Sequence, residues 1–473
     1  KYTVRYMNRG AVKQQTVAPY GTMVLYTGDT PTYTAEETAY KYYLFSGWDK
    51  GGYVTGDKDI NAVYDVCEYS ANYFNGKQFK DLRPVEVYAL TKVGIESSVI
   101  EDKDDITIQL GNDFSYSDIN ENVLIKTATE FTGKNYLDTN VKLFDVDRDF
   151  VLAIDFKMAS GNAMNTVLAQ CFETNGMNGF KLWNSSNSKI SWGTDSSDST
   201  AAGSRDMIVL RHIKGDNGLY VYTANIYGDD ITYTKISRNR VTKTNATLVF
   251  GCAKADDGAY ENYAKGTVYW SKLWYADLGD AACRKLAAWT HENVYYEACG
   301  FKRYYLSDGS NRRCSVTLIQ KNTLGPQMSL SGAMTNEGGW AKTTLHTYLN
   351  NRLLKALPIG WQQLIKQVKV SSSAGNKSKE IVTADCYFFI PSAIEVMPSM
   401  MDEPYIYEGT SISFMTDNES RKRTDSEGNP TNYWLRSPNA QYTTYFHTVE
   451  EDGEVYAYHY PSETAGVVTM FNI

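Results

Sequence analysis

The stretch Tyr433–Tyr460, YWLRSPNAQYTTYFHTVEEDGEVYAYHY, lies near the end of the 473-residue chain and is dense in aromatic residues. Within it, Tyr456, Tyr458 and Tyr460 are separated by single residues. Neighbouring residues of a β-strand point to opposite faces, so these three tyrosines are predicted to line one face of a strand. A core face would be rich in Val, Ile and Leu, whereas a tyrosine offers a rigid ring and a hydrogen-bonding hydroxyl. The pattern therefore predicts a contact surface.

This surface is the candidate ligand-binding site of the chain. Aromatic faces suit sugars, so we expect it to bind a bacterial surface polysaccharide, with a bacterial surface protein as the alternative ligand. Tyr433 and Trp434, at the start of the stretch, are instead predicted to pack in the interior. The predicted ligand-binding residues are Asn439, Tyr442, Tyr445, His447, Glu454, Tyr456, Tyr458 and Tyr460.

Residues 301–473, which contain this stretch, combine helix and strand patterns. Apolar residues between Gly338 and Leu357 recur at helical spacing, and Pro358 follows them, so an amphipathic helix is predicted that ends at this proline. A second short helix is predicted directly after it, and Cys386–Ser392 has the pattern of a buried strand. Helices packed on a compact sheet are typical of an α+β domain.

The same region carries four short motifs. They are Gly339-Trp340, Tyr348-Leu349-Asn350, Phe389-Ile390-Pro391-Ser392 and Tyr433-Trp434-Leu435-Arg436-Ser437-Pro438. Together they resemble a C-terminal domain common in phage tail proteins of Gram-positive hosts. Domains with this ending are similar to the C-type-lectin-like fold, which the resemblance implies for residues 301–473. Many relatives close with a turn of Gly, Val, Arg and Pro, whereas this chain has Gly466-Val467-Val468-Thr469 and departs from that pattern at the last strand.

Residues 121–300 consist of many short apolar runs separated by Gly, Asn, Asp and Ser turns, which predicts a β-sandwich. Apolar residues at helical spacing over residues 280–298 predict a helix that follows the sandwich. The sandwich resembles the concanavalin and laminin-G jelly-roll superfamily. The residues that carry this resemblance are Phe131-Thr132-Gly133, Tyr136-Leu137 and Gly266-Thr267-Val268-Tyr269-Trp270.

Residues 1–66 alternate apolar and polar residues between turns, which predicts short strands. The segment Phe45-Ser46-Gly47-Trp48 and the strand that closes this region resemble the internalin-type B repeat, a β-grasp-like module of surface proteins. The resemblance implies a spacer that projects a binding domain. Trp48 is predicted to be a core residue, with a role in binding as the alternative. Residues 67–120 are predicted to be a β-rich connector with short strands in 82–94 and 104–114.

The order of these modules predicts a multidomain, mainly β protein that resembles the host-recognition proteins of phage tails. The resemblance implies an adhesion protein in the virion tail that binds a bacterial surface ligand, contacts other tail proteins and forms a homo-oligomer. A bacterial cell-surface adhesin and a cell-wall or capsule polysaccharide depolymerase are the two alternatives. The chain begins at Lys1 rather than Met, so we expect it to be a segment of a longer or processed protein.

Composition and motifs exclude several classes of function. The net charge is −8 and no long basic run occurs, which argues against nucleic-acid binding. No apolar stretch reaches the roughly 20 residues that span a bilayer. Motifs of serine hydrolases, zinc proteases, P-loop proteins and dinucleotide-binding proteins are absent, so we predict a protein that is not an enzyme and has no catalytic residues. The acidic residues around Gly453 are predicted to form a hairpin tip rather than a glycosidase site.

The triplet Asp145-x-Asp147-x-Asp149 is the one candidate for a calcium site. Its spacing matches the start of an EF-hand loop, but Phe150 occupies the position of the required glycine and no glutamate stands at position twelve. A turn that enters the next strand is therefore predicted, with no cofactor and calcium kept as the alternative. The seven cysteines are scattered and never form a CxxC pair, which predicts free, mostly buried thiols.

Overall fold

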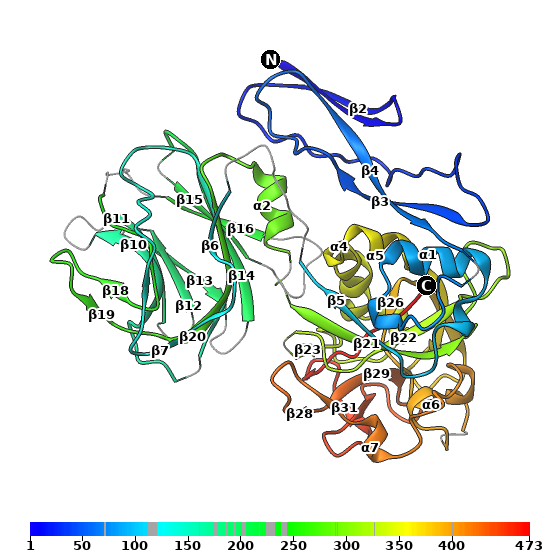
Figure 1. Cartoon of the computed structure of the whole chain (residues 1–473). Coiled ribbons are helices and arrows are strands. Elements are labelled where there is room, and N and C mark those ends of the chain that lie inside the picture. The colour runs from blue at the N-terminus through cyan, green and yellow to red at the C-terminus, as the bar shows by residue number, and fades with distance from the viewer. Residues whose placement is uncertain are drawn as a thin grey trace.

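The computed structural model contains several β-sheets in more than one domain, and this confirms the predicted multidomain, mainly β class. Figure 1 shows the β-sandwich on one side, the C-terminal domain on the other, and the N-terminal strands in blue beside both. The structure describes the chain except for residues 71, 112–120, 160, 174–177, 185–187, 193–194, 201–204, 217, 224–231, 238–243, 289, 291, 326 and 400–401.

The N-terminal module is a four-stranded sheet in the order β2-β1-β4-β3, in which β1 and β4 run parallel. Its strands are β1 (Tyr2–Asn8), β2 (Ala11–Ala18), β3 (Lys41–Trp48) and β4 (Lys58–Glu68). Trp48 is half-buried, and its ring centroid lies 4.8 Å from that of Tyr6 and 5.3 Å from that of Phe45. Trp48 therefore packs against the small core of this module, as predicted.

The segment after this module differs from the predicted connector. Residues 84–93 form helix α1 (Pro84–Val93) where a short strand was predicted. Pro84 occupies the first helical position, and Glu86 accepts a hydrogen bond of 2.8 Å from the amide of Arg83. Gly94 ends the helix in the left-handed conformation that glycine favours. These signals for the start and the end of a helix outweigh the preference of the segment's β-branched residues for a strand.

Strand β5 (Asp105–Gln109) pairs antiparallel with β21 (Asn293–Phe301), about 190 residues later in the chain. Both belong to a five-stranded sheet in the order β26-β33-β22-β21-β5. The sandwich is therefore inserted between two neighbouring strands of the C-terminal domain. The predicted domain boundaries at residues 120 and 300 separate strands that belong to this one sheet. Sequence patterns did not show this, because pairing over such a distance leaves no local signal.

The inserted sandwich has one sheet in the order β13-β12-β11-β10-β17-β8 and a second in the order β16-β15-β14-β9-β20-β6. Its core contains residues of both sheets, among them Phe156, Leu168, Phe180 and Leu210. The strands are β6 (Glu121–Ile125), β7 (Thr129–Thr132), β8 (Leu137–Asp138), β9 (Phe150–Met158), β10 (Val167–Glu173), β11 (Asn178–Asn184), β12 (Ser188–Trp192), β13 (Asp195–Thr200), β14 (Arg205–His212), β15 (Gly218–Thr223), β16 (Thr232–Ser237), β17 (Val249–Phe250), β18 (Ala253–Lys254), β19 (Tyr260–Glu261) and β20 (Lys265–Trp274).

The helix predicted over residues 280–298 is much shorter than expected. It is α2 (Asp280–Leu286), and the predicted helical position Val294 lies in strand β21. The edge of β5 binds this segment as a strand, which overrides its helical spacing. Met23 and Tyr53 of the N-terminal module pack against the cluster that contains α2 and the outer side of β9 and β14.

The C-terminal domain contains the predicted amphipathic helix. It is formed by α3 (Thr344–Tyr348), the π-helical turn η4 (Leu349–Leu353) and α4 (Leu354–Ala356), and it ends before Pro358 as predicted. Its remaining elements are η1 (Phe79–Asp81), η2 (Glu96–Ser98), β22 (Val316–Gln320), β23 (Met328–Ser329), η3 (Trp340–Lys342), α5 (Ile359–Leu364), β24 (Val368–Ser373), β25 (Ile381–Cys386), β26 (Phe388–Phe389), α6 (Ala393–Val396), η5 (Tyr405–Tyr407), α7 (Asn418–Arg421), β27 (Arg423–Thr424), β28 (Pro430–Thr431), β29 (Tyr433–Pro438), β30 (Phe446–Val449), β31 (Val455–His459), β32 (Thr464–Ala465) and β33 (Met470–Asn472).

A buried ion pair joins β29 to the rest of this domain. Arg436 and Glu395 both have fully buried side chains, and Arg436 Nη1 lies 2.6 Å from Glu395 Oε2. The same guanidinium donates hydrogen bonds to the carbonyls of Ser371 at 3.0 Å and Ile390 at 2.8 Å, and to the carbonyl of Glu408. One side chain thus connects β24, the segment after β26, helix α6 and the segment after η5.

The acidic triplet of the sandwich has structural partners. Asp147 accepts hydrogen bonds from the amide of Gly215, and Asp149 Oδ1 accepts one of 2.6 Å from the amide of Lys214. Asp145 pairs with Arg148. In the described parts of the chain, no group of three or more His, Cys, Asp or Glu residues is placed to hold a metal ion.

All seven cysteines are buried free thiols, as predicted from their scattered positions. Burial raises the pKa of Cys171 and of Cys252 to about 12, so neither thiol ionises at neutral pH. Among the residues that the structure describes, no helix is long and apolar enough to cross a membrane.

Arg436→Met leaves the buried carboxylate of Glu395 without its closest cation. We expect the free energy of unfolding of the C-terminal domain to fall by about 3–5 kcal/mol, measured by urea denaturation. Arg312→Met is the matched control, because the Arg312 side chain is 73% exposed. A loss no larger than that of the control would contradict the role given to the buried pair.

Glu408→Gln tests the electrostatics around this pair. Burial raises the pKa of Glu408 from 4.5 to about 7, so the unfolded chain ionises first and stability falls as pH rises through this window. Gln keeps an acceptor for the amide of Ser373, and its amide group can donate to the Ser437 hydroxyl, which in the wild type donates to Glu408. We expect the variant to be more stable than the wild type by about 2–3 kcal/mol at about pH 8, with the difference vanishing near pH 4. A difference that does not change with pH would contradict this assignment.

Candidate functional site

The candidate site lies on the three-stranded sheet β29-β30-β31. Tyr442, Tyr456 and Tyr458 are 45%, 47% and 44% exposed, and Tyr445 and Tyr460 are half-buried beside them. Strand β31 exposes Tyr456 and Tyr458 while Val455, Ala457 and His459 are less exposed, as the alternation predicts. We call these five tyrosines the tyrosine face.

The five rings form one continuous cluster. The ring centroid of Tyr458 lies 5.5 Å from that of Tyr456, 5.6 Å from that of Tyr442 and 5.7 Å from that of Tyr445. Tyr445 and Tyr460 are 4.7 Å apart, and the Tyr445 hydroxyl donates a 3.0 Å hydrogen bond to the hydroxyl of Tyr460. This bond raises the pKa of Tyr445. The rings support one another edge to face, which fixes their positions before a ligand arrives.

Two predicted contact residues lie beneath the tyrosine face instead of on it. Asn439 is buried, its side-chain amide donates to the carbonyl of Ala457 at 2.8 Å, and its oxygen accepts from the amides of Gln441 and Tyr442. This bonding pattern explains the asparagine: it closes the turn that leads to the tyrosines. The prediction that Asn439 touches the ligand is corrected to a supporting role.

His447 is buried as well. Its Nδ1 lies 3.0 Å from the carbonyl oxygen of Ser437, and burial lowers the pKa of the ring to about 4, so it is neutral at physiological pH. His447 lies in β30, the central strand of the three-stranded sheet, where all four residues are buried. Its predicted contact with the ligand is therefore corrected too.

Glu454 is exposed at the turn between β30 and β31, so its predicted place at the surface is correct. The amide of Glu450 donates a 2.8 Å hydrogen bond to the carbonyl of Glu454, which makes the acidic segment a hairpin turn as predicted. His459, which was not among the predicted site residues, lies between two carboxylates, 3.1 Å from Glu450 and 3.0 Å from Glu463. Glu463 also accepts a 3.0 Å hydrogen bond from the amide of Tyr460, which joins a carboxylate to the edge of the tyrosine face. We call Glu450, Glu454 and Glu463 the acidic rim.

Asn336 is the most important residue that sequence reasoning missed. It is buried, and its side-chain amide lies 3.2 Å from the carbonyl oxygen of Asn439, 2.8 Å from that of Tyr442 and 3.0 Å from that of Tyr445. These carbonyls belong to the loop that presents two tyrosines of the site. A single asparagine about 100 residues earlier in the chain gives no local signal of such a role.

Tyr405 supports the same loop from η5. Its hydroxyl accepts a 2.9 Å hydrogen bond from the amide of Ala440, and its ring centroid lies 5.0 Å from that of His447. Burial raises the pKa of Tyr405 to about 12. The tyrosine face is therefore a rigid aromatic surface held from below by buried polar groups, which suits recognition of a ligand with both apolar faces and hydroxyls.

Residues 314–473 match a protein family described as a domain of unknown function, DUF6273. The match covers most of the predicted C-terminal recognition region, including every residue of the tyrosine face. No curated protein matches the sequence.

Three solved structures overlap partly with the chain. The CBM40 domain of the Ruminococcus gnavus IT-sialidase, bound to α2,3-sialyllactose, has 12% identity and a TM-score of 0.27, covering 35% of this chain and 99% of that domain. The NanB sialidase of Streptococcus pneumoniae, as its K499G mutant, has 7% identity and a TM-score of 0.27, covering 41% of this chain and 36% of that one. The leech intramolecular trans-sialidase has 14% identity and a TM-score of 0.28, covering 43% of this chain and 33% of that one.

Asn336→Ala removes the donor that holds the loop of Asn439, Tyr442 and Tyr445. We expect faster amide hydrogen exchange in residues 439–445 and weaker ligand binding, while β31 keeps its protection. Asn75→Ala is the control, because Asn75 is exposed and its side-chain amide bonds Asn72, far from this loop. Unchanged exchange in the loop would show that Asn336 does not hold it.

Proposed function

We propose that this chain is a non-enzymatic adhesion protein that binds a bacterial surface polysaccharide through the tyrosine face. The observation that carries the proposal is the cluster of five tyrosines, exposed together on a sheet whose turn is fixed by buried polar residues. Aromatic rings offer large rigid contact area at a small loss of rotamer entropy. Their faces pack on the C–H groups of sugar rings while their hydroxyls hydrogen-bond the sugar hydroxyls.

The acidic rim beside the tyrosine face favours one kind of polysaccharide at this site. Glu450, Glu454 and Glu463 would repel a polyanionic chain from it, since like charges next to an interface disfavour a partner. A neutral or cationic glycan segment is therefore the ligand that fits the tyrosine face best. A protein ligand with complementary basic residues is the second candidate.

We further propose that the chain acts in a phage virion tail, as a homo-oligomer in contact with other tail proteins. The support for this proposal is the order of its modules, in which an N-terminal B-repeat-like spacer and a jelly-roll sandwich accompany a C-type-lectin-like recognition domain. A bacterial cell-surface adhesin built from the same modules is the alternative location. Both locations predict that the purified protein adsorbs to cells of Gram-positive hosts, so adsorption does not distinguish them. Immunolabelling of virions does, because only a tail protein would be labelled on the virion.

Tyr456→Ala, Tyr458→Ala and Tyr460→Ala combined should abolish binding to host cells. We expect the melting temperature to stay within a few degrees of the wild type, because these side chains lie at the surface. The matched control replaces three tyrosines that are exposed elsewhere, Tyr20, Tyr295 and Tyr407, by alanine. If the first variant still binds cells as the wild type does, the assignment of the site is wrong.

A depolymerase differs from an adhesion protein in releasing products from the polysaccharide, and this release can be measured. We expect no reducing sugar to be released when the protein is incubated with purified host-wall polysaccharide. Release that the triple tyrosine variant abolishes would replace the adhesion proposal with a hydrolytic one.

A further inference from the structure

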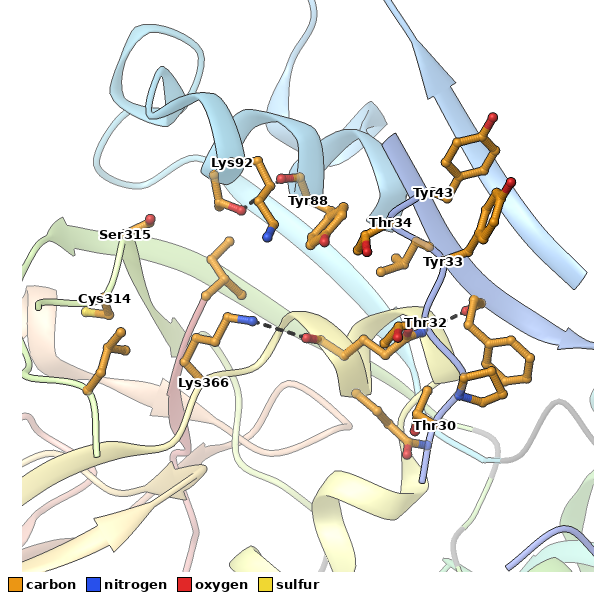
Figure 2. Close-up of a pocket in the computed structure, with 18 of the residues that line it drawn as sticks. Thr30, Thr32, Tyr33, Thr34, Tyr43, Tyr88, Lys92, Cys314, Ser315 and Lys366 are labelled. Carbon is orange, nitrogen blue, oxygen red and sulfur yellow. Dashed lines mark hydrogen bonds between the residues drawn. The ribbon is translucent and has the colours of Figure 1, made fainter. Parts of the chain in front are cut away.

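A cavity lies at the junction of the N-terminal module, α1 and the C-terminal domain, and its volume is about 610 Å³. Its walls are the loop Thr30–Thr34 and strand β3 of the N-terminal module, the end of α1, and the segments around Arg312 and Lys366. Volumes of this size are typical of sites that hold small ligands. We call it the junction cavity, and Figure 2 shows the side chains that line it.

The walls of the junction cavity are held together by direct contacts. The side-chain amide of Gln363, in α5, donates a 2.7 Å hydrogen bond to the carbonyl of Phe45 in β3. Gly360 packs closely against Pro84 and Leu44, so α5 approaches both α1 and β3 without space for a side chain. The cavity is therefore a feature of a fixed arrangement of three parts of the chain.

The charge of the cavity is opposite to that of the chain. Lys92, Arg312, Arg313 and Lys366 line it, and no Asp or Glu is among the described residues of its walls. The chain as a whole has 55 acidic and 47 basic residues and a net negative charge, whereas the four cations make this cavity locally positive. The same walls carry threonine and tyrosine hydroxyls, among them that of Tyr88.

Two of these cations are not neutralised by a carboxylate. Lys366 Nζ has a hydrogen bond of 3.4 Å to the carbonyl of Gln363, and Lys92 Nζ lies 5.1 Å from the ring centroid of Tyr88. Among the described residues, these two ammonium groups contact a carbonyl and an aromatic ring rather than an Asp or Glu side chain. In Figure 2 their ammonium groups point into the same space from opposite walls.

The other charged groups nearby are already engaged. Arg312 lies 3.4 Å from Asp308, and Arg313 donates to the carbonyls of Lys302 and Arg303. Ile473 also lines the cavity, and its backbone carbonyl oxygen accepts hydrogen bonds from the amides of Ser315 and Val316.

The arrangement of the lysines is unfavourable without a partner. The Lys366 side chain is exposed at the mouth of the cavity, where partial desolvation by nearby protein and the charges of Lys92 and Arg312 lower its pKa. An anion between the two lysines would relieve this repulsion and gain two charge-assisted hydrogen bonds. Like charges gathered in a cavity without an Asp or Glu in its described walls mark a candidate ligand site.

We propose that the junction cavity binds an anionic saccharide unit, with Lys92 and Lys366 holding its carboxylate or phosphate group. The neighbouring threonine and tyrosine hydroxyls suit the hydroxyl groups of a sugar ring, and the volume fits a unit of one to a few sugars. This site complements the tyrosine face, whose acidic rim disfavours anions. Two unlike sites on one chain would strengthen attachment to a mixed polysaccharide by multivalency.

Calorimetric titration of the full chain tests the proposal with four probes: trigalacturonate, glucose 6-phosphate, inorganic phosphate and the neutral trisaccharide maltotriose. We expect trigalacturonate, glucose 6-phosphate or both to bind, with affinity that falls as salt rises, and the neutral trisaccharide to show no binding at this site. Binding of only one anionic sugar identifies the carboxylate or the phosphate as the natural group. Binding of inorganic phosphate alone, or of no probe at millimolar concentration, overturns the proposal.

The variant Lys92→Gln with Lys366→Gln should weaken binding of the anionic sugar at least about tenfold and leave the melting temperature equal or higher. The matched control is Lys13→Gln with Lys80→Gln, which removes the same charge from two exposed sites outside the cavity. Lys92→Gln alone, at the exposed end of α1, serves if the double variant does not fold. The triple tyrosine variant should bind the anionic sugar like the wild type. If the proposal for the tyrosine face is wrong, this expected result for the cavity stays the same. Equal binding by the cavity variants and the control would overturn the proposal.

Discussion

The buried pair of Arg436 and Glu395 is the interaction on which the C-terminal domain depends. Two charges withdrawn from water are costly, and they are tolerated only where every hydrogen-bonding group nearby is satisfied. Arg436 meets this condition by bonding carbonyls from three separate segments besides the carboxylate. Because Arg436 lies in β29, it fixes this strand in the interior, and β30 and β31 then follow as the sheet that carries the tyrosine face.

The contacts around Arg436 explain why the short Trp-Leu-Arg-Ser-Pro string is characteristic of this domain. Every residue of β29 is buried. Trp434 donates its indole N–H to the carbonyl of Met328 at 2.7 Å, and the hydroxyl of Ser437 bonds the buried carboxylate of Glu408. Each position thus meets a different part of the domain. A substitution at any of them leaves a buried polar group unsatisfied or a cavity in the core, so the string is constrained along its whole length.

Patterns of short range predicted much of this molecule. Alternation placed Tyr456 and Tyr458 at the surface, and helical spacing with a following proline located the helix that ends before Pro358. Both signals arise within a few residues, where the period of the backbone alone decides which side chains share a face. The hairpin at Gly453 was predictable for the same reason.

Interactions between distant segments were not predictable. The pairing of β5 with β21 across the inserted sandwich determines the domain boundaries and turns a predicted helical segment into a strand. Asn336 and Tyr405 hold the site from other parts of the chain, and His447 is buried in the central strand of its sheet. None of these effects leaves a local periodicity, because each depends on which segments meet in three dimensions.

The central claim is that the tyrosine face is where the chain meets its ligand. Nitration of tyrosines, quantified by mass spectrometry for the free protein and for the protein bound to host cells, tests it most directly. The account predicts that Tyr442, Tyr456 and Tyr458 lose reactivity on binding while Tyr20 and Tyr407, exposed elsewhere, remain reactive. Full reactivity of Tyr442, Tyr456 and Tyr458 in the bound state would contradict it.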